Sequence, residues 1–210
     1  HSHYPQMFLM DGVAYMGESE PATQSTVIIS ESGSTDDVVL RVTLRRAAAK
    51  IIVTIKPGNK VIFTPELIAK SQGYLMRNMP TRTTLVEEGG YPLTEGGARP
   101  YWASTTISQT PYYTLFEDSD GIYNLQITAY CYSHTWDSSE AFDKGTSLVV
   151  MIPILYKESD DSTPIEYINN YYQISFSKME GSVGNSYHQI RRNTLYDLRI
   201  NLNAPGAEDY

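Results

Sequence analysis

The side chains that could do chemistry are few in this sequence. It has a single cysteine, Cys131, and four histidines, which are His1, His3, His134 and His188. Cys131 follows the apolar phase of an alternating segment with Leu125 and Ile127, so we expect a buried structural thiol and not a nucleophile. The sequence contains no Gly-x-Ser-x-Gly, P-loop, His-Glu-x-x-His or Cys-x-x-Cys motif. We therefore expect no catalytic residues and a protein that is not an enzyme.

Candidate ligands for a metal ion are equally sparse. Glu117, Asp118 and Asp120 form a short acidic turn, but a calcium loop would need a downstream bidentate glutamate that is missing at the right spacing. His1 and His3 could chelate an adventitious metal, although a loose terminus is the better interpretation. Glycoside hydrolysis needs two carboxylates held across a cleft, and nothing singles out such a pair among the 24 acidic residues. We expect no metal site and no cofactor.

Aromatic residues suggest a different chemistry, which is binding. The chain has 17 tyrosines and five phenylalanines, and tyrosine suits both partly solvent-exposed sheet faces and binding surfaces. Trp136 and Tyr132 flank a short segment around His134 that could present aromatic rings to a ligand. The same side chains would serve equally well in the core of a β-sandwich. Ligand contact through Trp136 and Tyr132 is thus one of two open readings.

The elements that would position these residues are β-strands. Near the end of the chain, Tyr196, Leu198, Ile200 and Leu202 alternate strictly with polar residues, which is typical of a strand with one buried face. Similar alternation occurs in residues 38–45, 49–55, 123–132 and 171–176. The first of these segments predicts an inward face of Val38, Leu40, Val42 and Leu44. Only residues 64–71 suggest a helix, with Thr64 as its cap and Pro65 in its first position. The class is mainly β, in sandwich-like layers.

Composition and charge limit the domains and the partners. Residues 87–100 contain four glycines and two prolines, so we expect a boundary there, with one domain at 1–102 and another at 103–210. The net charge is −8 with scattered basic residues, which argues against nucleic acid or an anionic membrane as the main partner. The longest apolar run, 148–156, is too short to span a bilayer. The start of the sequence looks abrupt, and we expect that the natural chain begins earlier.

Two stretches in this order resemble a known family. "VTLRRAAAKIIVTI" (42–55) is similar to a strand signature of the fimbrillins, the subunits of the type V pili of Bacteroidales, and "IRRNTLYDLRINLNAPG" (190–206) is similar to their closing strand. "FLMDG" (8–12) resembles a motif that precedes the first signature. The signature residues that the resemblance marks as structural are Arg46, Ala47, Lys50, Arg192, Asn193 and Tyr196. It implies two tandem transthyretin-like β-sandwich domains, the first lacking its N-terminal strands.

The resemblance also implies a function and a location. Fimbrillins are made as lipoprotein precursors and assemble at the outer membrane by donor-strand exchange, after a trypsin-like protease removes an N-terminal strand. We expect any such cut ahead of His1, because Arg45 and Arg46 lie inside a strand pattern. The residues after the closing strand are too few and too acidic to form a donor strand, which favours a tip, accessory or anchor-like subunit over a stalk subunit; the alternative is that a donor tail is missing from this chain. Its partners would be other pilus subunits, and a host protein or glycan through adhesion. The alternative is a cell-surface module that binds carbohydrate or protein.

Overall fold

The computed structural model describes residues 10–12, 14–15, 39–70, 73–79, 99–102, 113–136, 145–176 and 189–209. They form a mainly β structure with one short helix, α1 (Pro65–Ile68). Thr64 caps this helix as predicted, because its Oγ1 accepts a hydrogen bond of 3.2 Å from the backbone N–H of Leu67. Within the described ranges, no helix is long and apolar enough to cross a bilayer.

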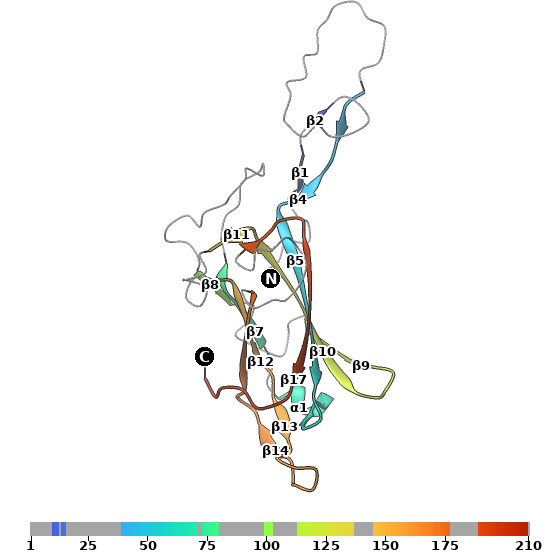
Figure 1. The fold of residues 1–210 in the computed structure, drawn as a ribbon, viewed down its shortest axis with the longest axis vertical. Coiled ribbons are helices and arrows are strands. Elements are labelled where there is room, and N and C mark those ends of the chain that lie inside the picture. The colour runs from blue at the N-terminus through green and yellow to red at the C-terminus, as the bar shows by residue number, and fades with distance from the viewer. Residues whose placement is uncertain are drawn as a thin grey trace, which may run out of the picture.

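The first four-stranded sheet has the order β17–β5–β10–β9 (Figure 1). Its strands are β5 (Ala48–Pro57), β9 (Tyr113–Glu117), β10 (Tyr123–Tyr132) and β17 (Leu195–Leu202). β10 runs antiparallel to β5 and places Ile127 opposite Val53, whereas β17 runs parallel to β5 and places Leu198 opposite the same valine. The alternation of apolar and polar residues predicted strands at β5, β10 and β17, and the structure confirms them.

The second four-stranded sheet, β15–β12–β7–β8, is antiparallel throughout. Its strands are β7 (Gly73–Met79), β8 (Arg99–Trp102), β12 (Ser147–Met151) and β15 (Tyr171–Ser175). Two smaller sheets have the orders β14–β13–β6 and β11–β16. Their strands are β6 (Val61–Ile62), β11 (His134–Thr135), β13 (Ile154–Tyr156), β14 (Ile165–Tyr167) and β16 (Gln189–Ile190). The apolar run at 148–156 is therefore two strands in different sheets, separated at Ile152 and Pro153.

The inward faces of the two large sheets share one hydrophobic core. Ile51 and Ile127 from the first sheet and Met76 and Leu148 from the second are all fully buried in it. The Tyr74 hydroxyl also donates a hydrogen bond of 3.3 Å to a backbone carbonyl of β10. β5 and β10 bury alternate residues over most of their length, whereas β12 buries four consecutive residues, Ser147 to Val150, so the period-2 pattern marks the strands of the first sheet more clearly than those of the second.

The expected division at residue 102 does not separate these sheets. β5 comes from the first half of the chain, yet both of its neighbours, β10 and β17, come from the second half. In the second sheet, β7 likewise pairs with β12. A glycine- and proline-rich segment indicates a loop, but it does not show which strands the loop connects in space. The described strands thus form a single core, and they do not show two tandem transthyretin-like domains.

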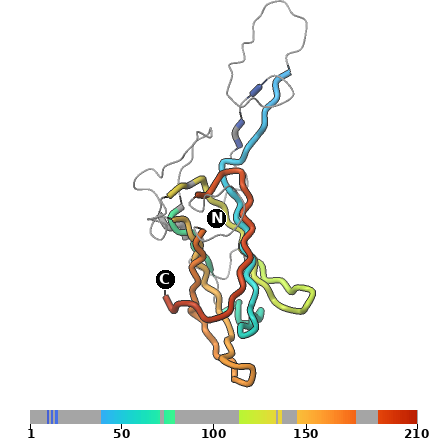
Figure 2. Tube along the Cα trace, in the orientation of Figure 1, coloured from blue at the N-terminus to red at the C-terminus, as the bar shows by residue number. Residues whose placement is uncertain are grey.

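A two-stranded ribbon extends from one end of the sandwich (Figures 1 and 2). It pairs β1 (Met10–Asp11) with β4 (Arg45–Arg46), and β2 (Ala14–Tyr15) with β3 (Arg41–Val42). We call the described residues of 10–15 and 39–46 the arm. The predicted inward face at Leu40, Val42 and Leu44 was wrong, because these side chains are 41%, 48% and 56% exposed. A ribbon of two strands has no second layer against which such a face could be buried.

Candidate functional site: the β5–β17 junction and the open side

The two signature segments contact each other at one end of the first sheet. The backbone N–H of Arg46 donates to Asn193 Oδ1 at 3.2 Å, and Arg192 Nε donates to the Arg46 carbonyl at 3.4 Å. The backbone N–H of Asn193 donates to the Ala48 carbonyl at 3.1 Å. Residues that are 147 positions apart in the sequence therefore form one joint, which we call the junction.

The junction brings together all six signature residues that the resemblance marked. Ala47 is 1% exposed and Arg192 is 3% exposed, so both lie inside the joint. The backbone N–H of Lys50 donates to the Thr194 carbonyl at 3.0 Å, which begins the parallel pairing with β17. Small side chains at 47–49 suit this position because they let the turn before β17 approach the backbone of β5. The signatures thus specify how the first and last strands of this sheet meet.

Asn193 holds the turn that leads into β17. Its φ is +54°, in the left-handed region that asparagine tolerates better than most residues. The Thr194 hydroxyl donates to the Arg192 carbonyl at 3.1 Å and stabilises the same turn. Asparagine therefore does two things at this position: it adopts the turn conformation and it accepts the Arg46 hydrogen bond.

Replacing Asn193 should separate these two contributions. We expect Asn193→Ala to lower the free energy of unfolding by about 1–2 kcal/mol, because it loses the hydrogen bond and strains the turn. Asn193→Gly loses only the hydrogen bond and should cost about half as much. Urea unfolding of the two variants beside the parent protein measures both values. Equal costs for alanine and glycine would contradict a conformational role for the positive φ.

Tyr196 extends the junction towards the second sheet. Its hydroxyl oxygen accepts a hydrogen bond of 2.8 Å from the backbone N–H of Arg191, and its ring meets Phe176 edge-on with centroids 6.4 Å apart. Phe176 directly follows β15, so this contact joins the two sheets at their edges. Partial burial raises the pKa of the Tyr196 phenol above its ordinary value, and the hydrogen bond from Arg191 opposes this shift.

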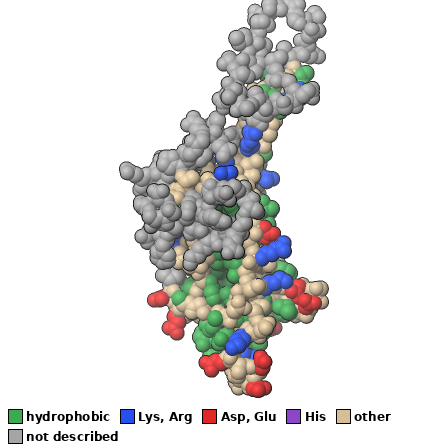
Figure 3. Space-filling model, viewed as in Figure 1, with side chains coloured by type: hydrophobic (Ala, Val, Ile, Leu, Met, Phe, Trp, Pro, Cys, Tyr) green, Lys and Arg blue, Asp and Glu red, His purple; other side chains and the backbone are tan. Residues whose placement is uncertain are grey.

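Beside this contact, the edge strands β17 and β15 bound one side of the sandwich, which we call the open side. In the described part of the chain, β17 pairs only with β5, and β15 pairs only with β12 apart from one bridge to Ala207. Inward-facing side chains on these edges are only partly covered: Tyr172, Ile174, Tyr196 and Ile200. Figure 3 shows hydrophobic atoms at the surface on this face of the molecule. The open side therefore combines an unpaired strand edge with a partly exposed apolar surface.

The residues after β17 fasten the lower end of the open side. Tyr171 and Ala207 exchange backbone hydrogen bonds of 2.8 and 3.0 Å, and the Tyr172 hydroxyl donates to the Ala204 carbonyl at 2.9 Å. Asn170 is buried, and its Oδ1 accepts a hydrogen bond from the backbone N–H of Gly206 at 2.6 Å. We call residues 203–209 the C-terminal clasp. Sequence reasoning missed its partner, although the Ala-Pro-Gly that ends the strand pattern was a signal for a turn there.

The predicted ligand-contact aromatics do not form an exposed platform. Trp136 is 8% exposed and belongs to the hydrophobic core, while Tyr132 is half-buried on β10 opposite Ala48. Cys131 is buried as expected, and its burial raises the pKa of the thiol to about 12. A thiol that stays protonated at neutral pH is a poor nucleophile. Among the described residues, the two aromatic rings and the thiol thus serve packing.

Of the two proposed metal sites, the structure describes the acidic turn but not the histidines near the start of the chain. His1, His3 and His188 lie outside the described residues, and His134 belongs to β11. Within the described ranges, no group of three or more histidine, cysteine, aspartate or glutamate residues could hold a metal ion.

The acidic turn at the end of the β9–β10 hairpin is held together by Asp118. Its carboxylate accepts hydrogen bonds from Asn124 Nδ2 at 3.0 Å and from the backbone N–H groups of Ile122 and Asp120, both at 3.1 Å. Lys56 Nζ lies 3.4 Å away. These donors, with Asn124 the largest contributor, lower the pKa of Asp118 from 3.8 to about 2. Such a carboxylate acts as the hub of a turn and has no acceptor capacity left for a metal ion.

Asp118 should make the hairpin sensitive to acid. Because its pKa is lower in the folded chain, its contribution to stability is present above its ordinary pKa of 3.8 and is lost as the pH falls to about 2. We expect Asp118→Asn to lose less stability than the parent over this range, as measured by thermal unfolding at a series of pH values. Asp120→Asn is the control for the same charge change in the same turn. Parallel curves for Asp118→Asn and the parent would contradict the role of this carboxylate.

Comparison with known proteins finds distant likeness to solved structures but no match to a family model or a curated sequence. No protein-family model matches the chain, and no curated protein sequence matches it. The structure is similar to a crystal structure from Bacteroides fragilis that is described as a "putative cell adhesion protein", with a TM-score of 0.36 and 8% sequence identity. The match covers 78% of this chain and 44% of that one, so the chain spans less than half of its length. A likeness this distant does not assign the chain to a family.

Proposed function

We propose that the chain is a structural subunit of a bacterial surface fimbria, completed by a strand from another subunit. Its role is that of a building part and not of an enzyme. The signature resemblance supports this proposal, and so does the way in which the two signatures meet at the junction. The observation that carries it is the open side, where an unpaired edge and partly covered apolar side chains lie together.

The physical reason is that one added strand would satisfy two needs at once. Backbone N–H and C=O groups on the edge of β17 that no described strand pairs would gain hydrogen bonds, and alternate side chains of the incoming strand would cover Tyr196, Ile200 and Ile174. Edge strands of this kind pair readily with other chains unless something protects them. Among the described residues, the clasp covers the end of β15 near Tyr171.

The clasp also bears on the position of the subunit. Residues 203–209 are bonded to Asn170, Tyr171 and Tyr172 of the same chain, so they are engaged and not free to enter a neighbouring subunit. A tip, accessory or anchor-like subunit at the cell surface would not need this segment as a donor strand, and we propose that role over a stalk subunit. Adhesion to a host protein or glycan is part of the same proposal. Trp136 lies in the core, so it does not support the alternative of a separate sugar-binding module.

The proposal is tested by following assembly of the full-length precursor. The precursor is treated with an arginine-specific protease, and the products are examined for ladders that resist SDS. Ile200→Asp and Ile174→Asp, which place a charge on either edge of the open side, should each abolish the ladder. Ile165→Asp is the matched control, because Ile165 is 45% exposed on β14, away from these edges. Thermal unfolding of each variant confirms that it folds, and a precursor that stays monomeric after cleavage would contradict strand exchange.

A further inference from the structure

The outer edge of β17 is formed by residues whose side chains lie on the exposed face of the sheet. The Thr194 carbonyl accepts a hydrogen bond of 3.0 Å from the backbone N–H of Lys50 on β5. At the other end of the strand, the Leu202 carbonyl accepts one of 2.7 Å from the N–H of Gly58, just after β5. Because residues two apart direct their backbone groups to the same side of a strand, the even-numbered residues of β17 face β5. The outer edge therefore carries the backbone groups of the odd-numbered residues, whose side chains are exposed: Leu195, Asp197, Arg199 and Asn201.

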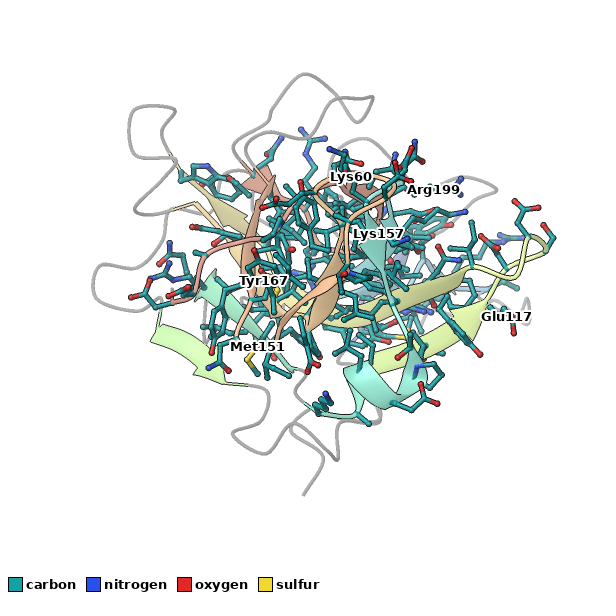
Figure 4. All side chains as sticks on the ribbon, turned by 90° about the horizontal axis from the view of Figure 1, so that it is seen from below. Lys60, Glu117, Met151, Lys157, Tyr167 and Arg199 are labelled. Atoms are coloured by element: carbon teal, nitrogen blue, oxygen red, sulfur yellow. The ribbon has the colours of Figure 1, made fainter. Side chains whose placement is uncertain are left out.

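Two charged side chains of opposite sign lie on this edge. Arg199 Nη2 is 3.4 Å from Asp197 Oδ2, and the two side chains are 81% and 47% exposed. Their register neighbours on β5 are Thr54 and Ile52, which carry no charge. Figure 4 shows Arg199 at the periphery of the molecule, outside the packed core. Both charges of β17 are thus displayed along its outer edge, where a neighbouring strand would meet them.

The sequence of β17 is complementary to itself when a second copy of the strand runs antiparallel to it. If a two-fold axis passes through Leu198, residue 197 of each copy lies opposite residue 199 of the other. Asp197 then faces Arg199 of the second copy, and the symmetry repeats this pair on the other side of the axis. An axis through residue 197 or residue 199 would instead place like charges directly opposite each other, which is unfavourable. Charge therefore selects one register for this pairing.

The backbone and the inner face favour the same register. Leu198 lies near the middle of β17, so an axis there pairs nearly the whole strand, with Leu195 opposite Asn201 of the second copy at either end. Odd-numbered residues meet odd-numbered residues, so the backbone groups on the two outer edges form hydrogen-bonded pairs. On the inner face, Tyr196 lies opposite Ile200 of the second copy, and a single chain buries both of them only in part. Charge, backbone and apolar surface thus agree on one arrangement.

We propose that two copies of this chain associate through their β17 edges, antiparallel and about a two-fold axis at Leu198. The first sheets of the two copies then form one continuous sheet with the two β17 strands at its centre. The same patch is used on both copies, so the contact closes on itself and gives a dimer. The dimer goes beyond strand exchange, because it needs neither a protease nor a donor strand. It protects the β17 edge from other chains, and it has to dissociate before a donor strand can bind there.

Sedimentation velocity of the full chain over a range of concentrations tests the dimer. We expect a reversible equilibrium between monomer and dimer. Asp197→Lys leaves only basic side chains at the paired positions and Arg199→Glu leaves only acidic ones, so each variant alone should raise the dissociation constant about tenfold. Mixing the two variants should restore dimers, because each basic edge then meets an acidic edge. A parent chain that stays monomeric, or a mixture that restores nothing, would overturn the proposal.

A matched variant controls for the change of charge. Asp160→Lys makes the same substitution at an exposed position in the loop between β13 and β14, away from β17, and should leave the equilibrium unchanged. Thermal unfolding of each variant confirms that it folds. A control that weakens the dimer as much as Asp197→Lys does would overturn the pairing of charges on β17.

Cysteine cross-linking tests the register. The pairing brings residue 195 of one copy opposite residue 201 of the other, within reach of a disulfide. A mixture of Leu195→Cys and Asn201→Cys should therefore give a covalent dimer under mild oxidation. Leu195→Cys alone should not, because the two residues 195 lie at opposite ends of the paired strands, and the native Cys131 is buried. A covalent dimer of Leu195→Cys alone would overturn the register.

The dimer and strand exchange can fail separately. The precursor with Arg199→Glu should still form ladders that resist SDS, because its β17 edge keeps the backbone groups and the inward-facing side chains that a donor strand needs. A parent chain that stays monomeric but whose precursor forms ladders would contradict only the dimer. A chain that dimerises but whose precursor forms no ladders would contradict only strand exchange.

Discussion

Ile127→Ala is expected to lower the free energy of unfolding by about 2–5 kcal/mol. Ile127 is fully buried at the centre of β10, opposite Val53 of β5, and its side chain faces the core that both large sheets share. Truncation removes three buried carbon atoms and leaves a cavity that strands fixed by their ladders cannot easily close. Urea unfolding followed by tyrosine and tryptophan fluorescence measures the change.

Ile122→Ala is the control for this prediction. Ile122 is in the turn of the same hairpin but is 45% exposed, so its truncation should change the free energy of unfolding by less than about 0.5 kcal/mol.

The unfolding curves also test whether the two sheets share a single core. Because β5 has both of its neighbours in the second half of the chain, we expect one cooperative transition. Two transitions, only one of which shifts in Ile127→Ala, would support separate domains instead.

Asn170→Ala is expected to cost about 2–4 kcal/mol, because Asn170 is a buried polar side chain with three partners. Its Nδ2 donates to the Ile152 carbonyl at 2.9 Å and to the Tyr172 hydroxyl at 2.7 Å, and its Oδ1 accepts from Gly206. Alanine would leave the Ile152 carbonyl and the Gly206 N–H without these partners. The clasp would then lose a main attachment to β15, and the backbone amide of Tyr171 would lose protection from hydrogen exchange.

Thermal unfolding and amide hydrogen exchange measure the two parts of this effect. We expect faster exchange at Tyr171 and Ala207, whose backbone groups pair with each other, and no change at β10. Asn201→Ala is the control, because Asn201 is exposed on β17. Gly206→Ala should release the clasp by another route, since a Cβ at Gly206 would overlap the backbone carbonyl oxygen of Tyr171. Unchanged exchange in both Asn170→Ala and Gly206→Ala would contradict the clasp.

Local patterns predicted the strands better than they predicted the partners of those strands. Alternation identified β5, β10 and β17 because each buries one face, and burial of every second residue is a local property. It could not show that β5 lies between β10 and β17, since pairing depends on contacts between distant segments. The exposed face of the arm was missed for the same reason: Leu40, Val42 and Leu44 alternate like core residues, but no layer lies against them. Loop composition carries no information on sheet order, so the expected boundary could not show that β5 pairs with strands that follow it.

In the candidate site, too, the sequence indicated individual residues but not the contacts between them. The resemblance marked Arg46 and Asn193 as signature residues, yet only the structure shows that the two segments bond to each other. Trp136 had two readings, and burial in the core favours packing. Asn170 carries no motif and has ordinary neighbours in the sequence, so its network with Tyr172 and Gly206 was outside the reach of pattern analysis.

The parallel pairing of β5 with β17 has a consequence for how the protein reaches its folded state. The junction joins residues that are 147 positions apart, so β5 is synthesised long before its neighbour on that side exists. Closing so large a loop is entropically costly, and proteins dominated by such distant pairings fold slowly. The first sheet should therefore stay incomplete until β17 has emerged, and the uncovered edge of β5 needs protection from aggregation until then.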